Sequence, residues 1–366
     1  MNRKLLTVAI AGAMAAPMSA QAVKYKLSGQ VNRAVVFMND GHQSDVRHVD
    51  SISSGTRIRL RGSEDLGNGM QAGFYWELQT SSNPSSAAFP DQNSDGNQNT
   101  NNIRQAHVWF SGNWGKLSMG QLDGAGNGAV EVDLSGTAIA GSLSFRSSFA
   151  NGLRWRTGTG GTIANPNGGG ALTHGNTYAQ YDAFSRYDGV RYDSPALGPV
   201  VVSASVGNDA TWEVAARADT ALGGGRLRGA LFYGESSGGV GTGTGSTGNV
   251  DNRWGGSISY LFAQGTSITG FYAENETEAG LDSDAWGAML GHRWGPHAVS
   301  ISYGEATDVI PGFDDSGFTL AYVHNLKKAN TELYAGYNFN ELDTPVGVAS
   351  VDEHNVFLVG ARVKFD

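Results

Sequence analysis

The stretch SGTRIRLRGSEDLGNGMQAGFYWELQ, residues 54–79, contains two alternating segments joined by a corner rich in glycine and asparagine. In the first segment, Arg57, Arg59 and Arg61 alternate with Ile58 and Leu60. Successive side chains of a β-strand point to opposite faces, so the three guanidiniums share one face and the two alkyl groups share the other. The pattern therefore predicts a strand with one basic and one apolar face.

The segment after the corner continues this two-sided pattern. Apolar side chains fall on one face and mostly polar ones on the other: Met70, Ala72, Phe74, Trp76 and Leu78 against Gln71, Gly73, Tyr75, Glu77 and Gln79. Similar segments of about ten residues recur as far as HNVFLVGARVKF, residues 354–365. The whole chain contains 53 glycines but only 9 prolines, and together with the alternating segments this predicts an all-β protein with many turns.

Two kinds of connection alternate between the segments. The short ones are EDLGNG, GNWG, SPALG, TALGGG, FAQG, RWGP and NLKKAN, and the long polar ones span residues 39–53, 81–100, 123–186, 236–250 and 340–353. Short turns at one end and long loops at the other are typical of an up-and-down barrel in an outer membrane. We expect one domain over residues 23–366, a sixteen-stranded antiparallel transmembrane β-barrel with both chain ends on the short-turn side.

A soluble β-sandwich or β-helix is the alternative all-β architecture. Against it, tyrosine and tryptophan gather near strand ends, as in the aromatic girdles of membrane barrels: Trp109, Trp114, Trp212, Tyr233, Trp254, Tyr260, Trp286, Trp294 and Tyr322. In a membrane barrel Ile58 and Leu60 would face lipid. The arginines would face a water-filled lumen, because each would cost about 2–4 kcal/mol near the lipid midplane.

The N-terminus and the charge narrow the location and the partners. Arg3 and Lys4, an apolar run and Ala20-Gln21-Ala22 predict a signal peptide over residues 1–22, cleaved after Ala22. The chain has 25 Lys+Arg against 34 Asp+Glu, a formal net charge of −9 that argues against nucleic acid. Without any cysteine, the exported fold must be stable without disulfides.

Three stretches also resemble the general porins of Gram-negative outer membranes: TRIRLRGSEDLGNGMQAGFYWEL, RQAHVWFSGNWGKLSMGQ and VRYDSPALG. The resemblance implies a homotrimer of sixteen-stranded barrels, each with its third external loop folded into the lumen. It also implies contact with outer-membrane lipid and lipopolysaccharide, passive diffusion of small hydrophilic solutes, no cofactor and no catalysis.

In this family a basic barrel wall faces an acidic third loop at the narrowest point of the pore. By resemblance, the basic side comprises Arg57, Arg59, Arg61, Arg104 and Arg191, and the acidic side comprises Asp123, Glu131 and Asp133. Gln30 stands where a lysine is common, which would shorten the basic ladder. The loop, residues 123–186, lacks the family's Pro-Glu-Phe type of signature. We expect its first half to fold inward and residues 157–176 to form an external flap.

Two further departures bear on assembly. Arg33 falls in the outward register of the first strand, which indicates either a local register shift or burial at a subunit contact. The chain ends in Phe365-Asp366, whereas a terminal aromatic residue is the usual assembly signal of the family.

Other chemistries find weaker support. Asp91, Asn93 and Asp95 match the first half of a calcium loop, but Asn102 replaces the bidentate glutamate, so a polar external loop is favoured. The histidines are scattered without a nucleophile elbow, and the face taken by His107 stays open. The alternatives are a substrate-selective channel of the same architecture, hinted at by Tyr75, Trp109 and Trp155, and a barrel enzyme or adhesin.

Overall fold

The computed structural model describes residues 23–90, 100–143, 149, 151–208, 210–237 and 250–366. The predicted signal peptide and the calcium candidates Asp91, Asn93 and Asp95 lie outside the described residues. Within the described part, no helix combines the length and the apolar character that crossing a membrane requires.

The described residues form one sheet of seventeen strands. They are β1 (Lys24–Asn39), β2 (Ser44–Asp50), β3 (Arg57–Gly67), β4 (Met70–Ser81), β5 (Thr100–Gly112), β6 (Gly115–Asp123), β7 (Arg186–Asp193), β8 (Val200–Gly207), β9 (Trp212–Leu222), β10 (Gly225–Ser236), β11 (Val250–Leu261), β12 (Thr266–Thr277), β13 (Asp282–Trp294), β14 (His297–Ile310), β15 (Phe313–Leu326), β16 (Thr331–Asp343) and β17 (His354–Phe365). Short helical turns are η1 (Ile52–Ser54), η2 (Ser85–Ala87), α2 (His174–Thr177) and η4 (Lys327–Ala329).

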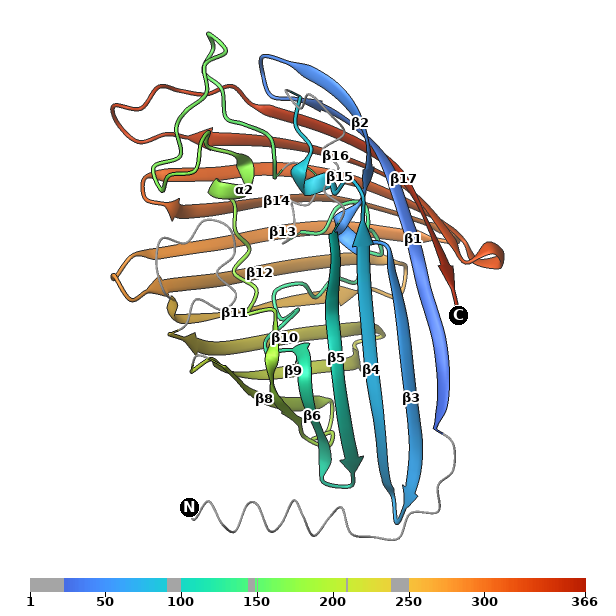
Figure 1. Ribbon diagram of the computed structural model, residues 1–366. Helices are drawn as coiled ribbons and strands as arrows, with labels where there is room; N and C mark the ends of the chain where they lie inside the picture. Colours follow the sequence, from blue (N-terminus) through green and yellow to red (C-terminus); the bar gives the residue numbers. More distant parts are fainter. Residues whose placement is uncertain (1–22, 91–99, 144–148, 150, 209, 238–249) are drawn as a thin grey trace.

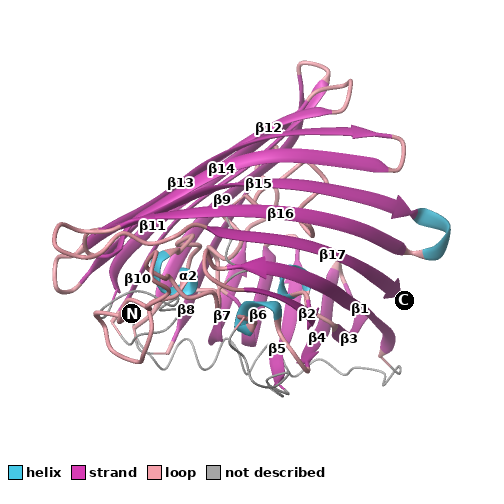
Figure 2. Cartoon of the chain, turned by 90° about the horizontal axis from the view of Figure 1, so that it is seen from above, coloured by secondary structure: helices cyan, strands magenta, loops and turns pink. Residues whose placement is uncertain are grey.

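The sheet closes on itself as a sixteen-stranded antiparallel barrel, because β2 and β3 are two halves of one barrel strand. Residues 33–39 of β1 pair with β2, and residues 24–30 of β1 pair with β3. Each later strand pairs with the next, and β17 pairs with β1 to close the ring (Figures 1 and 2). The predicted fold class and strand number are confirmed.

The interruption between β2 and β3 is filled by polar contacts from β1. The Gln30 amide donates to the Ser54 and Gly55 carbonyl oxygens at 2.8 and 2.9 Å, and the Asn32 amide donates to the Ser51 carbonyl oxygen at 3.2 Å. The expectation of a long loop over residues 39–53 is wrong. Asp40 closes a tight turn by accepting the Gln43 backbone N–H at 2.8 Å, which lets residues 44–50 return as β2.

Turn chemistry explains the opposite end of the barrel. Between β3 and β4, Asn68 and Gly69 have φ of 53° and 74°, the left-handed pair that a two-residue type I′ hairpin requires. Long loops begin and end where the sequence indicates, with residues 124–185 joining β6 to β7 and residues 237–249 joining β10 to β11.

The two faces of the wall differ in character. Large apolar side chains such as Leu231, Ile258 and Leu290 are exposed outward, while the inner face carries many small, buried polar side chains. Aromatic pairs such as Trp254 with Tyr272 lie on the outward face, as a girdle would. Trp109 departs from the prediction, because it lines the lumen.

Arg33 lies on the outward face of β1 within an unbroken register from Gly29 to Asn39, so the register-shift interpretation is wrong. Its guanidinium is 2.7 Å from the carboxylate of Asp50, which is itself buried. That carboxylate also accepts the backbone N–H groups of Ser82 and Asn83 at 2.8 and 3.0 Å. The ion pair is therefore built into the wall at the outer surface of β1.

Candidate functional site

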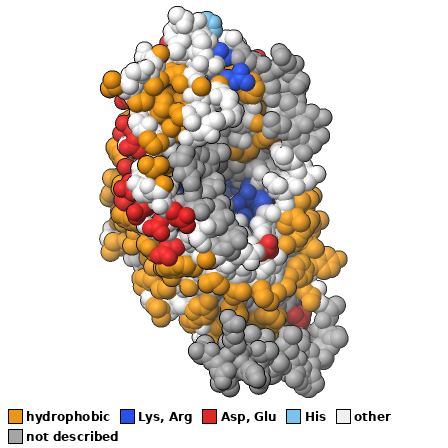
Figure 3. Space-filling view, turned by 60° about the vertical axis from the view of Figure 1, so that its left-hand side comes forward, with side chains coloured by type: hydrophobic (Ala, Val, Ile, Leu, Met, Phe, Trp, Pro, Cys, Tyr) orange, Lys and Arg blue, Asp and Glu red, His pale blue; other side chains and the backbone are white. Residues whose placement is uncertain are grey.

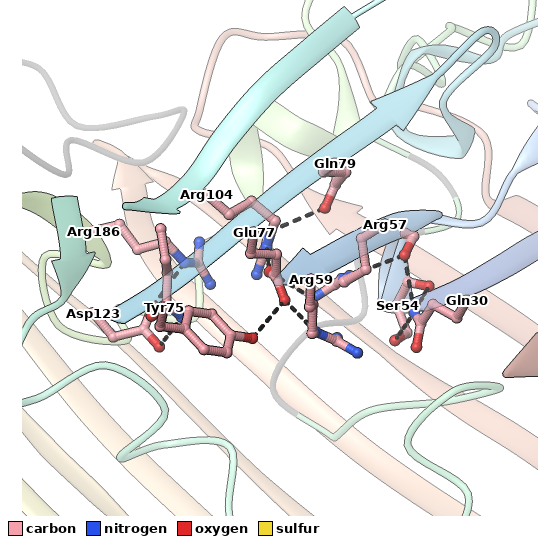
Figure 4. A network of polar contacts seen from close by, with 12 residues as sticks. Gln30, Ser54, Arg57, Arg59, Tyr75, Glu77, Gln79, Arg104, Asp123 and Arg186 are labelled. Carbon is pink, nitrogen blue, oxygen red and sulfur yellow. Dashed lines mark hydrogen bonds and ion pairs between the residues drawn. The ribbon is translucent and has the colours of Figure 1, made fainter. Parts of the chain in front are cut away.

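Glu77 on β4 is the centre of a basic cluster on the inner wall. The carboxylate is 4% exposed and contacts the guanidiniums of Arg57, Arg59 and Arg104, at 3.3 Å for Arg57 and 2.6 Å for Arg104. Tyr75 donates its hydroxyl to the same carboxylate at 3.1 Å (Figure 4). Strand alternation brings the β3 and β4 residues together, because Arg59 stands directly opposite Glu77 in the β3–β4 register. Arg104 joins them through a bulge in β5, where the β4–β5 register shifts between Glu77 and Leu78.

A second ion pair continues the wall toward β7. The Arg186 guanidinium lies 2.7 Å from the carboxylate of Asp123, which also accepts the Gln105 amide at 2.9 Å. Together, four guanidiniums (Arg57, Arg59, Arg104 and Arg186) share two carboxylates (Glu77 and Asp123) on this part of the wall (Figure 4). The wall is therefore locally positive, and Figure 3 shows basic side chains inside a hollow of the molecule.

The loop between β6 and β7 enters the barrel and runs along the opposite inner wall. Hydroxyl groups of Ser257 and Ser259 on β11 accept the backbone N–H groups of Val132 and Leu134 at 3.0 and 3.1 Å. Further on, the hydroxyls of Thr137 and Ser300 are 2.7 Å apart. The first half of the loop therefore lies in the lumen, fixed to β11 and β14.

Several wall arginines hold this loop by its backbone. Arg217 donates to the carbonyl oxygens of Ala125 and Asn127 at 2.6 and 2.8 Å, and Arg293 donates to those of Leu134 and Ser135. Arg191 and Arg253 also donate to loop carbonyls, those of Gly124 and Ala183. These guanidiniums therefore hold the loop in place by hydrogen bonds to its backbone.

Two buried or half-buried carboxylates organise the acidic part of the loop. Glu213 accepts the backbone N–H groups of Gly126 and Phe184, and Asp182 accepts those of Gly128 and Val130. The next carboxylate, Glu131, accepts the Gln180 amide at 3.0 Å. Confinement inside the barrel, and then repulsion from Asp182, raise the pKa of Glu131 to about 7, although its side chain still touches lumen water.

A cavity of about 420 Å³ separates the two charged surfaces. Arg57, Arg104 and Arg186 line one side. Glu131 and Asp182 line the loop side together with Arg253, whose guanidinium is bound to the loop carbonyl of Ala183. The geometry sets a positive wall against a negative loop across an aqueous gap. Such an arrangement creates a transverse field that orients dipolar solutes and discriminates ions by charge.

The structure brings together only part of the sequence-predicted set. Arg57, Arg104 and Glu131 line the cavity, and Arg59 joins them through Glu77. Asp123 lies on the basic wall, paired with Arg186, instead of on the acidic loop. Gln30 is buried against the strand interruption, so it does not line the cavity.

Three predicted residues lie elsewhere. Asp133 turns back to accept the Ser135 backbone N–H at 2.6 Å. Arg61 and Arg191 line a different cavity nearer the short-turn end, and Arg191 is paired with Asp193 at 2.8 Å.

Glu77, Arg186 and Asp182 are the members that sequence reasoning missed. Glu77 could have been predicted, because strand alternation places it on the inner face of β4. Arg186 and Asp182 lie at and just before the end of a long loop, where periodicity carries no information.

The prediction of an external flap over residues 157–176 is wrong only for the end of that range: residues 157–170 form a mostly exposed hairpin, whereas Leu172 and most of α2 are buried. Trp155 is fully buried and stacks on His354 with ring centroids 3.8 Å apart, so it does not line a pore. His174 and Thr177 of α2 bind the buried carboxylate of Asp315 on β15 at 2.8 and 2.6 Å. Hydrophobic and hydrogen-bonding contacts therefore attach this segment to the barrel wall.

Within the part of the chain that the structure describes, no group of three or more His, Asp or Glu side chains is arranged to hold a metal ion. His107 faces the lumen, stacked on Tyr75 with ring centroids 5.7 Å apart.

Comparisons with known proteins agree with this architecture. The family model for Gram-negative porins matches residues 6–345. Outer membrane porin protein 32 of Delftia acidovorans is 32% identical over 240 residues, which cover 58% of this chain and 63% of that protein. The match thus spans slightly less than two thirds of that relative's length.

Solved structures are similar in fold at low sequence identity. An anion-selective porin from Comamonas acidovorans superposes with a TM-score of 0.65 at 21% identity, covering 94% of this chain and all of that one. The trimer form of OmpT from Vibrio cholerae gives a TM-score of 0.58 at 16% identity over 94% of this chain and all of that one. With a closed barrel, a polar lumen and a family match over most of its length, the chain belongs to the Gram-negative porins and is an outer-membrane protein.

Proposed function

We propose that this porin is a passive, cofactor-free channel for small hydrophilic solutes, and that its constriction favours anions. The observation that carries the preference is the charge of the inner wall, where four guanidiniums share two carboxylates beside the 420 Å³ cavity. A fixed positive excess lowers the barrier for anions and raises it for cations. The anion selectivity of the Comamonas acidovorans porin is consistent with this direction.

We further propose that three copies associate through the outward face of β1. Support comes from Arg33 and Asp50, an ion pair located midway along a strand whose outward neighbours are apolar. An arginine facing lipid near the midplane costs about 2–4 kcal/mol, whereas a protein partner can surround the pair with polar contacts. The trimer form of the Vibrio cholerae structure is consistent with such association.

The direct test is the reversal potential of single channels in a potassium chloride gradient across a planar bilayer. Wild type should conduct in ohmic steps with anion preference, and Arg57→Ser combined with Arg104→Ser should shift the preference toward cations. Arg228→Ser is the matched control, because Arg228 faces the lumen on β10 but is paired with Asp219 away from the cavity. An unchanged reversal potential in the double variant would remove this cluster from the selectivity filter. An absence of conductance would favour the barrel enzyme or adhesin alternatives.

A further inference from the structure

A second cavity, of about 630 Å³, lies between the Glu77 cluster and the short-turn end of the barrel. It is formed mainly by the inner faces of β3 to β7, and Asp123 lines its upper part. Its volume is within the range of about 300–1,000 Å³ that is typical of small-molecule sites. We refer to this cavity as the lower cavity.

The lower cavity contains three aromatic rings on two adjacent strands. Tyr75 and His107 stand directly opposite each other in the β4–β5 register and stack at an interplanar angle of 23°. Trp109, two residues further along β5, packs against Gly73, where an added Cβ would come within 2.4 Å of the indole. The small residues Ser63 and Ser118 flank Gly73 and Trp109 in the same transverse row, so the space beside the ring stays open.

Positive charges border these rings. The Lys116 ammonium lies 5.0 Å from the centroid of Trp109, and Arg61 stands opposite Tyr75 in the β3–β4 register. In the part of the chain that the structure describes, neither Lys116 nor Arg61 has a carboxylate within ion-pair distance, whereas Arg191 nearby is paired with Asp193. The cavity thus combines aromatic surface with two cations that have no carboxylate partner there.

We propose that the lower cavity is a binding subsite for planar, single-ring carboxylates on their way through the channel. The ring of the solute stacks against the surface formed by Tyr75, His107 and Trp109, and its carboxylate pairs with Lys116 or Arg61. An aliphatic carboxylate of equal charge and similar size gains only the ionic contact, because stacking requires a planar ring. This subsite deepens the proposed channel function and rests on it.

The experiment compares benzoate with cyclohexanecarboxylate as blockers of chloride current through single channels of the full-length mature protein. Benzoate should reach half-block at a concentration about three- to tenfold lower, the range expected of one aromatic stacking contact. Trp109→Leu should abolish this difference while chloride still passes. Lys116→Gln should weaken block by both solutes. Arg226→Gln, which removes one lumen charge from β10, should leave the benzoate preference unchanged.

The outcomes separate the subsite from the channel. Conducting wild-type channels that both solutes block equally would overturn the subsite and leave the channel intact. A benzoate preference that survives Trp109→Leu would also overturn the assignment. Failure of wild type to conduct would instead overturn the proposed function. If Trp109→Leu does not fold, His107→Leu provides the same comparison, because it removes one ring of the stacked pair.

Discussion

A single buried carboxylate, Glu77, determines how much positive charge the wall presents to the lumen. Replacing it with glutamine keeps a hydrogen-bond acceptor but leaves Arg57, Arg59 and Arg104 without a counter-charge. We expect Glu77→Gln to increase anion preference, measured by the reversal potential. We also expect it to lower the free energy of unfolding by up to about 3 kcal/mol, because a largely buried ion pair is broken.

Glu235→Gln is the control for this prediction, since Glu235 is on the outward side of β10 and accepts the Tyr233 hydroxyl. It removes the same charge without touching the lumen. Equal reversal potentials for Glu77→Gln and wild type would contradict the role given to Glu77.

Glu131 gives the channel a dependence on pH in the neutral range. Its pKa of about 7 means that the carboxyl is mostly ionised at pH 8 and mostly protonated at pH 6. The loop loses negative charge as the pH falls, so anion preference should rise between pH 8 and pH 6. Reversal potentials recorded across this window should be nearly constant in Glu131→Gln. If Glu131→Gln keeps the full pH dependence of the wild type, other titratable groups must cause that dependence.

At the residue scale, the sequence identifies which side chains face the lumen better than it identifies what they do. Strand alternation puts Arg57 and Arg191 on the inner face, and a bulge in β5 turns Arg104 to the same face, but only Arg57 and Arg104 reach the cavity. Arg191 instead donates to the Gly124 carbonyl. Whether an arginine faces solute or holds a loop depends on where the loop runs, and residues 124–185 have no periodicity that would reveal it.

Among the elements, the second half of the long loop depends on one carboxylate of β15. Asp315 accepts both His174 and Thr177, so Asp315→Ala should release α2 from the wall and cost about 1–3 kcal/mol in local opening. We expect frequent partial closures in single-channel recordings and faster proteolysis between residues 151 and 178. Asp314→Ala is the neighbouring control, because Asp314 faces outward on the same strand. Equal cleavage rates in the two variants would exclude this attachment.

The strands themselves were largely predictable, because period-two alternation and turn residues act locally. The exceptions were β2, which depends on the Asp40 turn, and the attachment of the second half of the long loop, where the buried side chains of Trp155 and Leu172 flank a glycine-rich, exposed hairpin. The Asp40 turn is a local contact that counting period-two alternation does not detect. The burial of Trp155 and Leu172 depends on distant parts of the chain, which a single sequence does not display.

For the whole molecule, the outward Arg33–Asp50 pair predicts the consequence of losing the cation. At a subunit contact, Arg33→Ala leaves the buried carboxylate of Asp50 without its cation. When samples are heated to a series of temperatures before gel electrophoresis, trimers of this variant should dissociate at a lower temperature than wild-type trimers. Lys327→Ala, in the exposed turn after β15, should not change that temperature. If β1 instead faces lipid, removing the arginine should leave the assembly unchanged or stabilise the barrel, which would contradict the proposed contact.

The way the long loop is held has a consequence for redesign. Much of the loop is held by hydrogen bonds to its main chain. Carbonyl oxygens of the loop accept from Arg217, Arg293 and Arg253, and backbone N–H groups of the loop donate to Glu213 and Asp182. Every amino acid supplies a carbonyl, and all but proline supply an N–H. Side chains of the inward segment, such as Glu131, can therefore be substituted while the backbone keeps its path. The selectivity of the pore can thus be redesigned by changing this segment alone.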